Sequence, residues 1–175
     1  MIESKIKLTV RDVNDFPKPG IVFKDITPIL KDPALCLEIT KAMVEQVKGM
    51  DIDVVAGIES RGFLFGPQLA ELLNVPFVPI RKAGKLPYTT VQQTYELEYG
   101  TATIEMHEDA LLPGQKVLIH DDLLATGGTV VAASKLVMQL GAEVAGYSFI
   151  IALEFLNGRL RLAPYSDKVY SLASY

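Results

Sequence analysis

Short apolar runs alternate along the chain with segments in which apolar residues recur at helical spacing. The runs are typical of strands buried on both faces of a sheet, and they predict strands at 53–58, 75–80, 116–120, 147–153 and 168–172. Helical spacing predicts helices at 33–48, 63–73 and 130–140. The first has clear signals at both ends, because Asp32-Pro33 is a typical helix start and Gly49 a suitable stop. This alternation indicates an α/β fold with a Rossmann-like, mostly parallel central sheet flanked by helices.

The alternation fails between residues 81 and 102. This segment is polar, contains Gly84, Pro87 and Gly100, and lacks a steady period. A long irregular segment inside a compact domain is typical of a functional lid. We therefore expect an irregular lid near the carboxyl ends of the strands, where open α/β sheets bind their ligands.

Composition narrows the possible classes of function. The length of 175 residues favours one domain spanning 1–175, and 49% hydrophobic with 22% charged residues is typical of a globular protein. A net charge of −4 gives no electrostatic case for nucleic acid or an anionic membrane. No stretch approaches the roughly 20 apolar residues of a membrane span. Cys36 is the only cysteine, and the N-terminal segment lacks a signal-peptide core, so we expect a soluble, cytoplasmic protein.

Residues 117–129 carry the strongest functional signal. An apolar run leads into Asp121-Asp122, and a turn rich in small residues then precedes a helix. This turn comprises Ala125, Thr126, Gly127, Gly128 and Thr129. Glycine permits positive φ values that point backbone N–H groups at an anion, and the helix adds its unpaired amides and positive dipole end. The two threonines could donate hydroxyls as well. On its own, the turn is equally consistent with a phosphate site and with a plain strand-to-helix connection.

The adjacent carboxylates favour a sugar phosphate. Neighbouring strand residues point to opposite faces, so we expect the strand to end at His120 and both carboxylates to turn toward the ligand. Two carboxylates repel each other unless a cation or hydroxyl donors lie between them, and ribose hydroxyls or hydrated Mg²⁺ would fit. Alternatively, Asp122 caps the turn and Asp121 is solvated. His120 could couple to either carboxylate and titrate near neutrality, or be a tolerated strand-end residue.

A second concentration of charge follows the strand expected at 75–80. Arg81, Lys82 and Lys85 lie close together in an otherwise acidic protein. A solvated surface would explain them, but their place at the ligand edge of the sheet also suits a diphosphate. The turn Ser60-Arg61-Gly62 also joins a strand to a helix, as residues 125–129 do, so it is a second candidate anion site. Alternatively, Arg61 only forms a salt bridge on the surface.

These segments together resemble the type I phosphoribosyltransferases, and among them the members that use adenine. Asp121–Thr129 resembles the family's phosphoribosyl-diphosphate motif, and Ile58–Phe63 its Glu-Ser-Arg-Gly-Phe turn. Three further segments match in order, namely the basic loop Arg81–Pro87, the hood Tyr95–Gly100 and the base-pocket segment Val22–Pro28. The match runs from about Phe16 to Arg159.

The resemblance implies transfer of a phosphoribosyl group from 5-phosphoribosyl 1-diphosphate to adenine, giving AMP and diphosphate with Mg²⁺. Residues 125–129 would bind the 5′-phosphate, and Asp121 and Asp122 the ribose hydroxyls. The diphosphate would be bound by Ser60, Arg61, Arg81, Lys82 and Lys85. The base pocket would be lined by Val22, Phe23, Lys24 and Leu153. Mg²⁺ would be carried by the diphosphate without a direct protein ligand. Members of the family are commonly homodimers.

The resemblance also implies a catalytic role for the hood. Glu98 would be the acid or base at the purine, and Tyr99 would close the hood over the reacting centre. Spacing alone does not separate Glu98 from the neighbouring Glu96. Read without the resemblance, both are exposed loop charges.

The chain departs from the family pattern at two pocket positions. Lys24 stands where arginine is frequent, so the charge is kept but the planar fork is lost. Ala152 stands where many members have an acidic residue, and the acidic residue here, Glu154, comes after Leu153 instead. The residues that form the far wall of the base pocket around Leu153 are therefore not assigned.

Two other functions are consistent with parts of the pattern. One is a phosphoribosyltransferase for another base, and the other is a non-catalytic regulator that senses the same sugar diphosphate. A regulator would need a DNA-binding domain or a strongly basic face, which the length and net charge argue against. A nucleoside triphosphatase is excluded because the chain has no Gly-x-x-x-x-Gly-Lys-Ser/Thr sequence.

Overall fold

A seven-stranded sheet forms the centre of the molecule in the computed structural model, which describes residues 1–97 and 100–175. The strand order is β5-β6-β4-β3-β7-β8-β9. The strands are β3 (Val54–Ile58), β4 (Phe77–Lys82), β5 (Thr90–Glu96), β6 (Thr101–His107), β7 (Lys116–Leu124), β8 (Glu143–Ala152) and β9 (Val169–Ser174). Neighbours from β4 to β9 are parallel, whereas β6 runs antiparallel to both β4 and β5. The mostly parallel sheet is confirmed.

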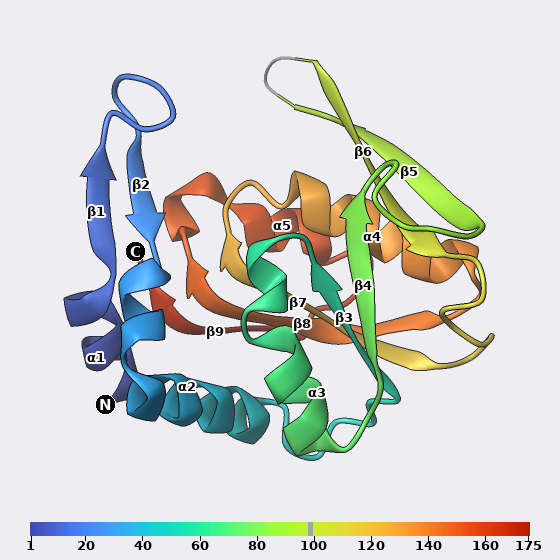
Figure 1. Cartoon of the computed structure of the whole chain (residues 1–175), viewed down its shortest axis with the longest axis horizontal. Coiled ribbons are helices and arrows are strands. Elements are labelled where there is room, and N and C mark those ends of the chain that lie inside the picture. The colour runs from blue at the N-terminus through green and yellow to red at the C-terminus, as the bar shows by residue number, and fades with distance from the viewer. Residues whose placement is uncertain (98–99) are drawn as a thin grey trace.

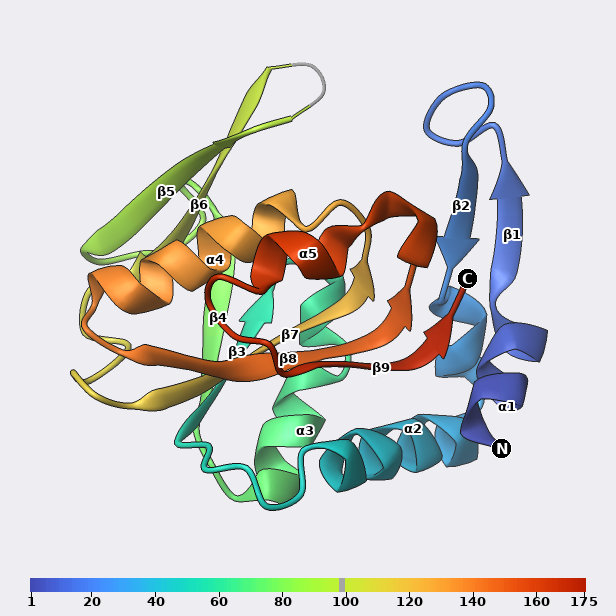
Figure 2. The ribbon, with the colours of Figure 1, turned by 180° about the vertical axis from the view of Figure 1, so that it is seen from behind.

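Helices cover both faces of this sheet (Figures 1 and 2). The helices α2 (Pro33–Gln46) and α3 (Gly66–Leu73) lie on one face, and α4 (Gly128–Gln139) and α5 (Gly158–Leu162) on the other. A hydrophobic core lies on each face of the sheet, and alternate strand residues pack into one or the other. In β7, Val117 and Ile119 pack toward α4, whereas Leu118 packs toward α2 and α3. The short helix α1 (Ile2–Thr9) packs beside β9. Within the described ranges, no helix has the length and apolar character needed to span a bilayer.

The expected helices are largely confirmed. Asp32 caps α2 by accepting hydrogen bonds from the backbone N–H groups of Ala34 and Leu35, each 3.0 Å long. The helix expected at 63–73 begins only at Gly66, after the 3₁₀ turn η2 (Arg61–Phe63). Two further 3₁₀ turns are η1 (Thr27–Lys31) and η3 (Glu154–Leu156).

The expectation of an irregular segment at 81–102 holds for residues 83–89, between β4 and β5, but is wrong for 90–96 and 101–102, because β5 and β6 form an antiparallel hairpin there. Their register runs from Thr90 opposite His107 to Glu96 opposite Thr101. Burial alternates along β5, with Val91, Gln93 and Tyr95 on the covered side. The middle inward position holds a glutamine, so the period-two hydrophobic signal was too weak to indicate a strand.

A separate two-stranded hairpin precedes the main sheet. Its strands β1 (Arg11–Asn14) and β2 (Val22–Asp25) are antiparallel, and Val13 pairs with Phe23. The loop of the β1–β2 hairpin and the end of β5 paired with the start of β6 extend beyond the same edge of the sheet, at opposite ends of that edge (Figure 1). These two hairpins therefore flank the carboxyl ends of the parallel strands.

Candidate functional site

The segments singled out from the sequence meet at the carboxyl edge of the sheet. Because β3 lies between β4 and β7, the turn after β3 is flanked by the basic loop after β4 and the phosphate loop (residues 125–129) after β7. Leu153 follows β8, and its backbone N–H donates to the carbonyl oxygen of Leu124 over 2.9 Å. Parallel pairing thus gathers residues that are far apart in sequence, as expected for ligand sites of open α/β sheets.

The strand β7 does not end at His120 but continues through both aspartates to Leu124. Pairing with β8 reaches Leu124 opposite Ala152, so the backbone stays extended and Asp121 and Asp122 do not turn to one side together. Asp122 faces η2, where Arg61 Nε lies 3.2 Å from its Oδ2. Asp121 is partly buried, and its Oδ1 accepts from the backbone N–H of Asp122 over 2.8 Å. Pairing with β8 thus keeps residues 121–124 extended, although their sequence favours a turn after His120.

Burial perturbs both carboxylates. Burial and then the neighbouring Asp122 charge raise the pKa of Asp121 well above its ordinary value. Burial also raises the pKa of Asp122, although the Arg61 guanidinium opposes that shift. The side chain of Asp122 is 2% exposed, and its Oδ2 has no well-aligned hydrogen-bond donor within the described residues. A hydroxyl-bearing ligand would supply the donor that Asp122 Oδ2 lacks.

The phosphate loop is held in place from two sides. Gly127 has a φ of 81° and is the N-cap of α4, so glycine is needed for this turn. On one side, α5 approaches so closely that a Cβ at Gly158 would clash with the carbonyl oxygen of Ala125. Arg161 Nη1 also donates to the carbonyl oxygen of Thr126 over 3.3 Å. These contacts leave the backbone N–H groups of the loop and of the first turn of α4 available for an anion.

On the other side, the hairpin contacts the end of the same loop. Thr129 Oγ1 donates to the hydroxyl oxygen of Tyr95 on β5 over 3.0 Å. The Thr129 hydroxyl expected to bind phosphate therefore has a protein partner in this structure. Tyr95 was not singled out from the sequence, although it is the first residue of the hood segment.

The turn after β3 places Arg61 between two predicted subsites. A Cβ at Gly62 would lie 2.8 Å from the carbonyl oxygen of His120, so only glycine lets this turn pass so close to β7. Arg61 pairs with Asp122 on one side, and its guanidinium carbon lies 4.9 Å from the centroid of the Phe23 ring on the other. Ser60 precedes it as the N-cap of η2, with no side-chain cap hydrogen bond.

The basic loop contains one neutralised cation and two free ones. Arg81 donates from Nε and Nη2 to the two carboxylate oxygens of Glu59, over 3.2 and 2.9 Å. This pairing lowers the pKa of Glu59. The side chains of Lys82 and Lys85 are exposed and have no ion-pair partner among the described residues. The structure therefore leaves the two lysines, rather than Arg81, as the free charges of this loop.

Glu105 shapes the basic loop and was missed in the sequence. It lies on β6, is 2% exposed, and accepts from the backbone N–H groups of Lys85 and Leu86 over 2.9 and 2.8 Å. Its other oxygen accepts from Thr90 and Gln92. A charged residue between Ile104 and Met106, both buried, was the available signal.

The first four residues of the base-pocket segment form β2, and Phe23 there faces Arg61. Phe23 contacts the Phe16 ring edge-on with centroids 5.1 Å apart, and Val22 is 47% exposed. Lys24 points elsewhere: its Nζ lies 2.6 Å from Asp12 Oδ1 and 4.1 Å from the centroid of the Tyr175 ring. Leu153 packs against the core shared with α2 and α3. Phe23 is thus the member of this set that adjoins the other site residues.

His120 is an interior residue whose ring nitrogens form no hydrogen bond with either aspartate in the described residues, contrary to the coupling considered from the sequence. Its Nδ1 is 3.0 Å from the carbonyl oxygen of Ser148, its Nε2 has no partner in the described part of the chain, and its exposure is 0%. Burial lowers the pKa of His120 to about 4. Because β7 continues past it, the imidazole points into the core and stays neutral at physiological pH.

Two predicted catalytic residues, Glu98 and Tyr99, lie outside the described residues. The rival Glu96 is exposed at the end of β5. Among residues 1–97 and 100–175, no cluster of three or more histidine, cysteine or acidic side chains is placed to hold a metal ion.

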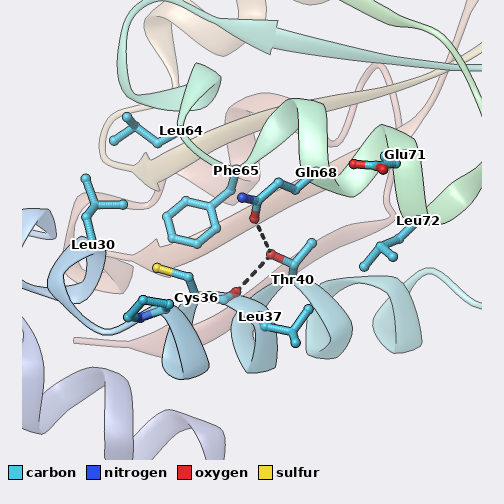
Figure 3. A pocket seen from close by; sticks show the side chains of 10 residues that line it. Leu30, Cys36, Leu37, Thr40, Leu64, Phe65, Gln68, Glu71 and Leu72 are labelled. Carbon is cyan, nitrogen blue, oxygen red and sulfur yellow. Dashed lines mark hydrogen bonds between the residues drawn. The ribbon is translucent and has the colours of Figure 1, made fainter.

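A cavity of about 490 Å³ lies away from this edge, between α2 and α3 (Figure 3). Its lining is mainly apolar and comprises Leu30, Pro33, Cys36, Leu37, Thr40, Leu64, Phe65, Gln68, Glu71 and Leu72. Within it, Thr40 Oγ1 is hydrogen-bonded to the carbonyl oxygen of Cys36 and to Gln68 Oε1. None of the residues proposed to bind substrate lines this cavity.

Comparison with known proteins agrees with this geometry. Residues 25–172 match the family described as "Phosphoribosyl transferase domain". The adenine phosphoribosyltransferase of Cytophaga hutchinsonii is 54% identical over 175 residues, covering 100% of this chain and 97% of the relative. That of Acidobacterium capsulatum is 55% identical over 170 residues, covering 97% and 93%.

Solved structures give the same result. The adenine phosphoribosyltransferase of Thermoanaerobacter pseudethanolicus superposes with a TM-score of 0.96 at 48% identity, covering 100% of both chains. The Saccharomyces cerevisiae enzyme, complexed with adenine and an imino-altritol bisphosphate, has a TM-score of 0.91 at 42% identity and covers 98% of each chain. The chain belongs to the phosphoribosyltransferase family, among the adenine phosphoribosyltransferases.

Proposed function

We propose that this protein transfers the 5-phosphoribosyl group of 5-phosphoribosyl 1-diphosphate to adenine, giving AMP and diphosphate, a reaction of purine salvage. The observation that carries the proposal is the convergence of three subsites at one sheet edge. These are the phosphate loop, the carboxylates of β7 and the Arg61–Phe23 contact. The close relatives that share this fold are named for the same reaction.

Catalysis of this reaction depends mainly on positioning the two substrates and on stabilising the charges that develop in the transition state. The bond from ribose C1′ to the diphosphate oxygen breaks, the bond to a ring nitrogen of adenine forms, and that nitrogen's proton is lost. Positive charge develops on the ribose meanwhile, and negative charge on the departing diphosphate. We assign the 5′-phosphate to residues 125–129 and the ribose hydroxyls to Asp121 and Asp122. The assignment is supported by Asp122 Oδ2, which has no hydrogen-bond partner within the described residues.

The diphosphate is assigned to Ser60, Arg61, Lys82 and Lys85, with Arg81 holding the loop through Glu59. The two exposed lysines and the partly exposed Arg61 supply positive charge on both sides of the turn after β3. Mg²⁺ would neutralise part of the diphosphate charge when bound. The donor set fits such an ion, because Asp121 and Asp122 could accept hydrogen bonds from its water molecules.

The base is assigned to Val22, Phe23 and Leu153, with the backbone of Lys24 beside them. The ammonium group of Lys24 is paired with Asp12, so it does not supply the charge that arginine would bring to this position. Glu98 is proposed as the acid or base at the purine and Tyr99 as the residue that closes the hood.

A homodimer is proposed to assemble through the α2–α3 surface. Four leucines around the cavity of Figure 3 are exposed by 37–49%, namely Leu30, Leu37, Leu64 and Leu72. A contiguous apolar surface of this kind is typical of a protein interface. Leu37→Glu should convert a dimer to a monomer in sedimentation, and an unchanged mass would exclude this surface. We further propose a cytoplasmic location, which suits the single free Cys36.

Incubation of the pure protein with labelled adenine, 5-phosphoribosyl 1-diphosphate and Mg²⁺ tests the function directly. Stoichiometric AMP and diphosphate are expected, and adenine should be used in preference to hypoxanthine, guanine, xanthine and orotate. Binding of the sugar diphosphate without turnover of any base would instead identify a regulator.

A further inference from the structure

Tyr95 connects the β5–β6 hairpin to the first turn of α4. Its hydroxyl oxygen accepts the 3.0 Å hydrogen bond from Thr129 Oγ1. Its ring lies against the same turn, since a Cβ at Gly128 would be 3.8 Å from Tyr95 Cδ2. Figure 2 shows α4 lying along the hairpin, and α4 packs on β5 over several positions. A hairpin side chain thus contacts one of the five residues assigned to the 5′-phosphate, Thr129, and lies near a second, Gly128.

We propose that Tyr95 is a positioning residue for the 5′-phosphate, acting through the hydroxyl of Thr129. The inference rests on the proposed function, because that function places the phosphate at residues 125–129. Tyr95 itself need not touch the ligand. It sets the direction in which Thr129 presents its hydroxyl to the first turn of α4.

The argument starts from the two hydroxyl groups, each of which can donate one hydrogen bond and accept others. In this structure Thr129 uses its only hydroxyl hydrogen on Tyr95. When a phosphate oxygen reaches the turn, Thr129 donates to the phosphate and accepts from Tyr95 instead. Both O–H groups rotate, no proton changes its oxygen, and the contact between the two side chains is kept throughout.

This arrangement favours phosphate binding for two reasons. Thr129 is already held in one rotamer by Tyr95, so little side-chain freedom is lost when the ligand arrives. A hydroxyl that accepts one hydrogen bond also becomes a stronger donor in the next, because bonds in a chain polarise one another. Loss of the Tyr95 hydroxyl should therefore weaken the phosphate contact while leaving the turn in place.

The same contact ties ligand binding to the hairpin. Tyr95 pairs with Ala102 on β6, and Tyr95 and Glu96, the last two residues of β5, are also the first two of the hood segment. A bound phosphate that engages Thr129 favours the position of β5 in which Tyr95 stays hydrogen-bonded. Backbone amides of β5 should then exchange more slowly with solvent when the phosphate site is filled.

Ribose 5-phosphate is the probe, because it has the 5′-phosphate but neither the diphosphate nor the base. Tyr95→Phe removes only the hydroxyl and should weaken ribose 5-phosphate binding about three- to tenfold, the effect of one hydrogen bond. The KM for 5-phosphoribosyl 1-diphosphate should rise by a similar factor, with kcat and the KM for adenine little changed. Thr129→Val should weaken binding at least as much, and adding Tyr95→Phe to it should cost little more.

Tyr147→Phe is the matched control. The Tyr147 hydroxyl is 2.7 Å from Ser134 Oγ, so this variant removes an equivalent bond to the buried middle of α4. It should lower the melting temperature without changing ribose 5-phosphate binding. Hydrogen exchange supplies the second measurement, since ribose 5-phosphate should protect β5 in the wild type but not in Tyr95→Phe.

Several results would overturn the proposal. They are wild-type affinity in Tyr95→Phe, an equal loss in Tyr147→Phe, and full additivity of Tyr95→Phe with Thr129→Val. Failure of the wild type to bind ribose 5-phosphate would overturn the proposal as well. The proposed function fails separately: a wild type that binds ribose 5-phosphate but forms no AMP would refute the activity and leave the role of Tyr95 intact.

Discussion

Arg61 and Asp122 form an ion pair that joins the ribose side of the site to the base side. Nε of Arg61 is 3.2 Å from Oδ2 of Asp122, whose side chain is 2% exposed, whereas that of Arg61 is 33% exposed. The same guanidinium lies 4.9 Å from the centroid of the Phe23 ring. A diphosphate that attracts Arg61 competes with Asp122 for the guanidinium group. The Asp122 carboxylate released in this way can accept a hydrogen bond from a ribose hydroxyl.

Asp122→Asn should weaken use of the sugar diphosphate without unfolding the protein. The amide keeps the shape but loses the charge, so hydrogen bonds from ribose hydroxyls weaken, and KM for 5-phosphoribosyl 1-diphosphate should rise by about tenfold or more. Because burial raises the pKa of Asp122, the fold disfavours the charged form, and the melting temperature should not fall by more than a few degrees. Steady-state kinetics measures the KM, and thermal unfolding measures the melting temperature. Unchanged kinetics would remove Asp122 from the ribose site.

Gly158→Ala should displace the phosphate loop from the side that contacts α5. The added methyl group would clash with the carbonyl oxygen of Ala125, so the loop or α5 must shift, at a cost of roughly 1–3 kcal/mol in stability. Affinity for ribose 5-phosphate should fall as well, since the loop amides move. Gly114→Ala is the control, because its φ of 82° brings strain but no atom lies within 4 Å of the new Cβ. Equal binding by both variants would contradict the role of Gly158.

His120→Val should reduce the sensitivity of the fold to acid. The pKa of His120 is about 4 in the folded protein, against an ordinary value of 6.5, so between these pH values only the unfolded chain takes up the proton. The free energy of unfolding therefore falls as pH is lowered through this window, by about 3 kcal/mol in total from this residue. Asp121 and Asp122, whose pKa values are raised, act in the opposite direction.

The comparison of variant with wild type isolates the histidine from these carboxylates. Denaturant unfolding at pH 7.5 and pH 4.5 should show a smaller difference for His120→Val than for the wild type. An identical pH dependence in the two proteins would mean that His120 is not kept neutral by burial.

Glu98→Gln and Glu96→Gln should separate the two candidate glutamates. If Glu98 exchanges a proton with the purine, its amide should lower kcat about a hundredfold, within the usual range for a general acid or base. Glu96 is exposed at the end of β5, so its amide should change kcat little. Single-turnover measurement of AMP formation tests the chemical step. A normal rate for Glu98→Gln would exclude it from catalysis, and a slow rate for Glu96→Gln would assign the role there.

The strands and helices that carry strong periodic signals could be predicted. Val54–Ile58 is buried at every position, as its unbroken apolar sequence indicated, and Asp32 caps α2 through its side chain. The β5–β6 hairpin was missed because Gln93 interrupts its inward-facing positions. The continuation of β7 through Asp121 and Asp122 was missed because pairing with β8 decides it, and pairing is not visible in a single segment.

The site residues divide in the same way. Residue types and spacing pointed to the phosphate loop, the two aspartates and the basic loop, because anion binding needs small residues, amides and cations close together in sequence. Their partners come from distant segments: Glu59 neutralises Arg81, Asp12 pairs with Lys24, and Asp122 holds Arg61. None of these pairings could be read from local spacing.

The functional groups present at this protein's site are thus determined by local sequence, in Asp121–Thr129 and in the turn after β3. Which of those groups are free to act is a tertiary property. Parallel strand pairing sets Arg61 beside Asp122, the hairpin brings Tyr95 to Thr129, and α5 brings Gly158 against Ala125. The physical reason is that charge neutralisation and hydrogen bonding act over a few ångströms of space, whatever the separation along the sequence.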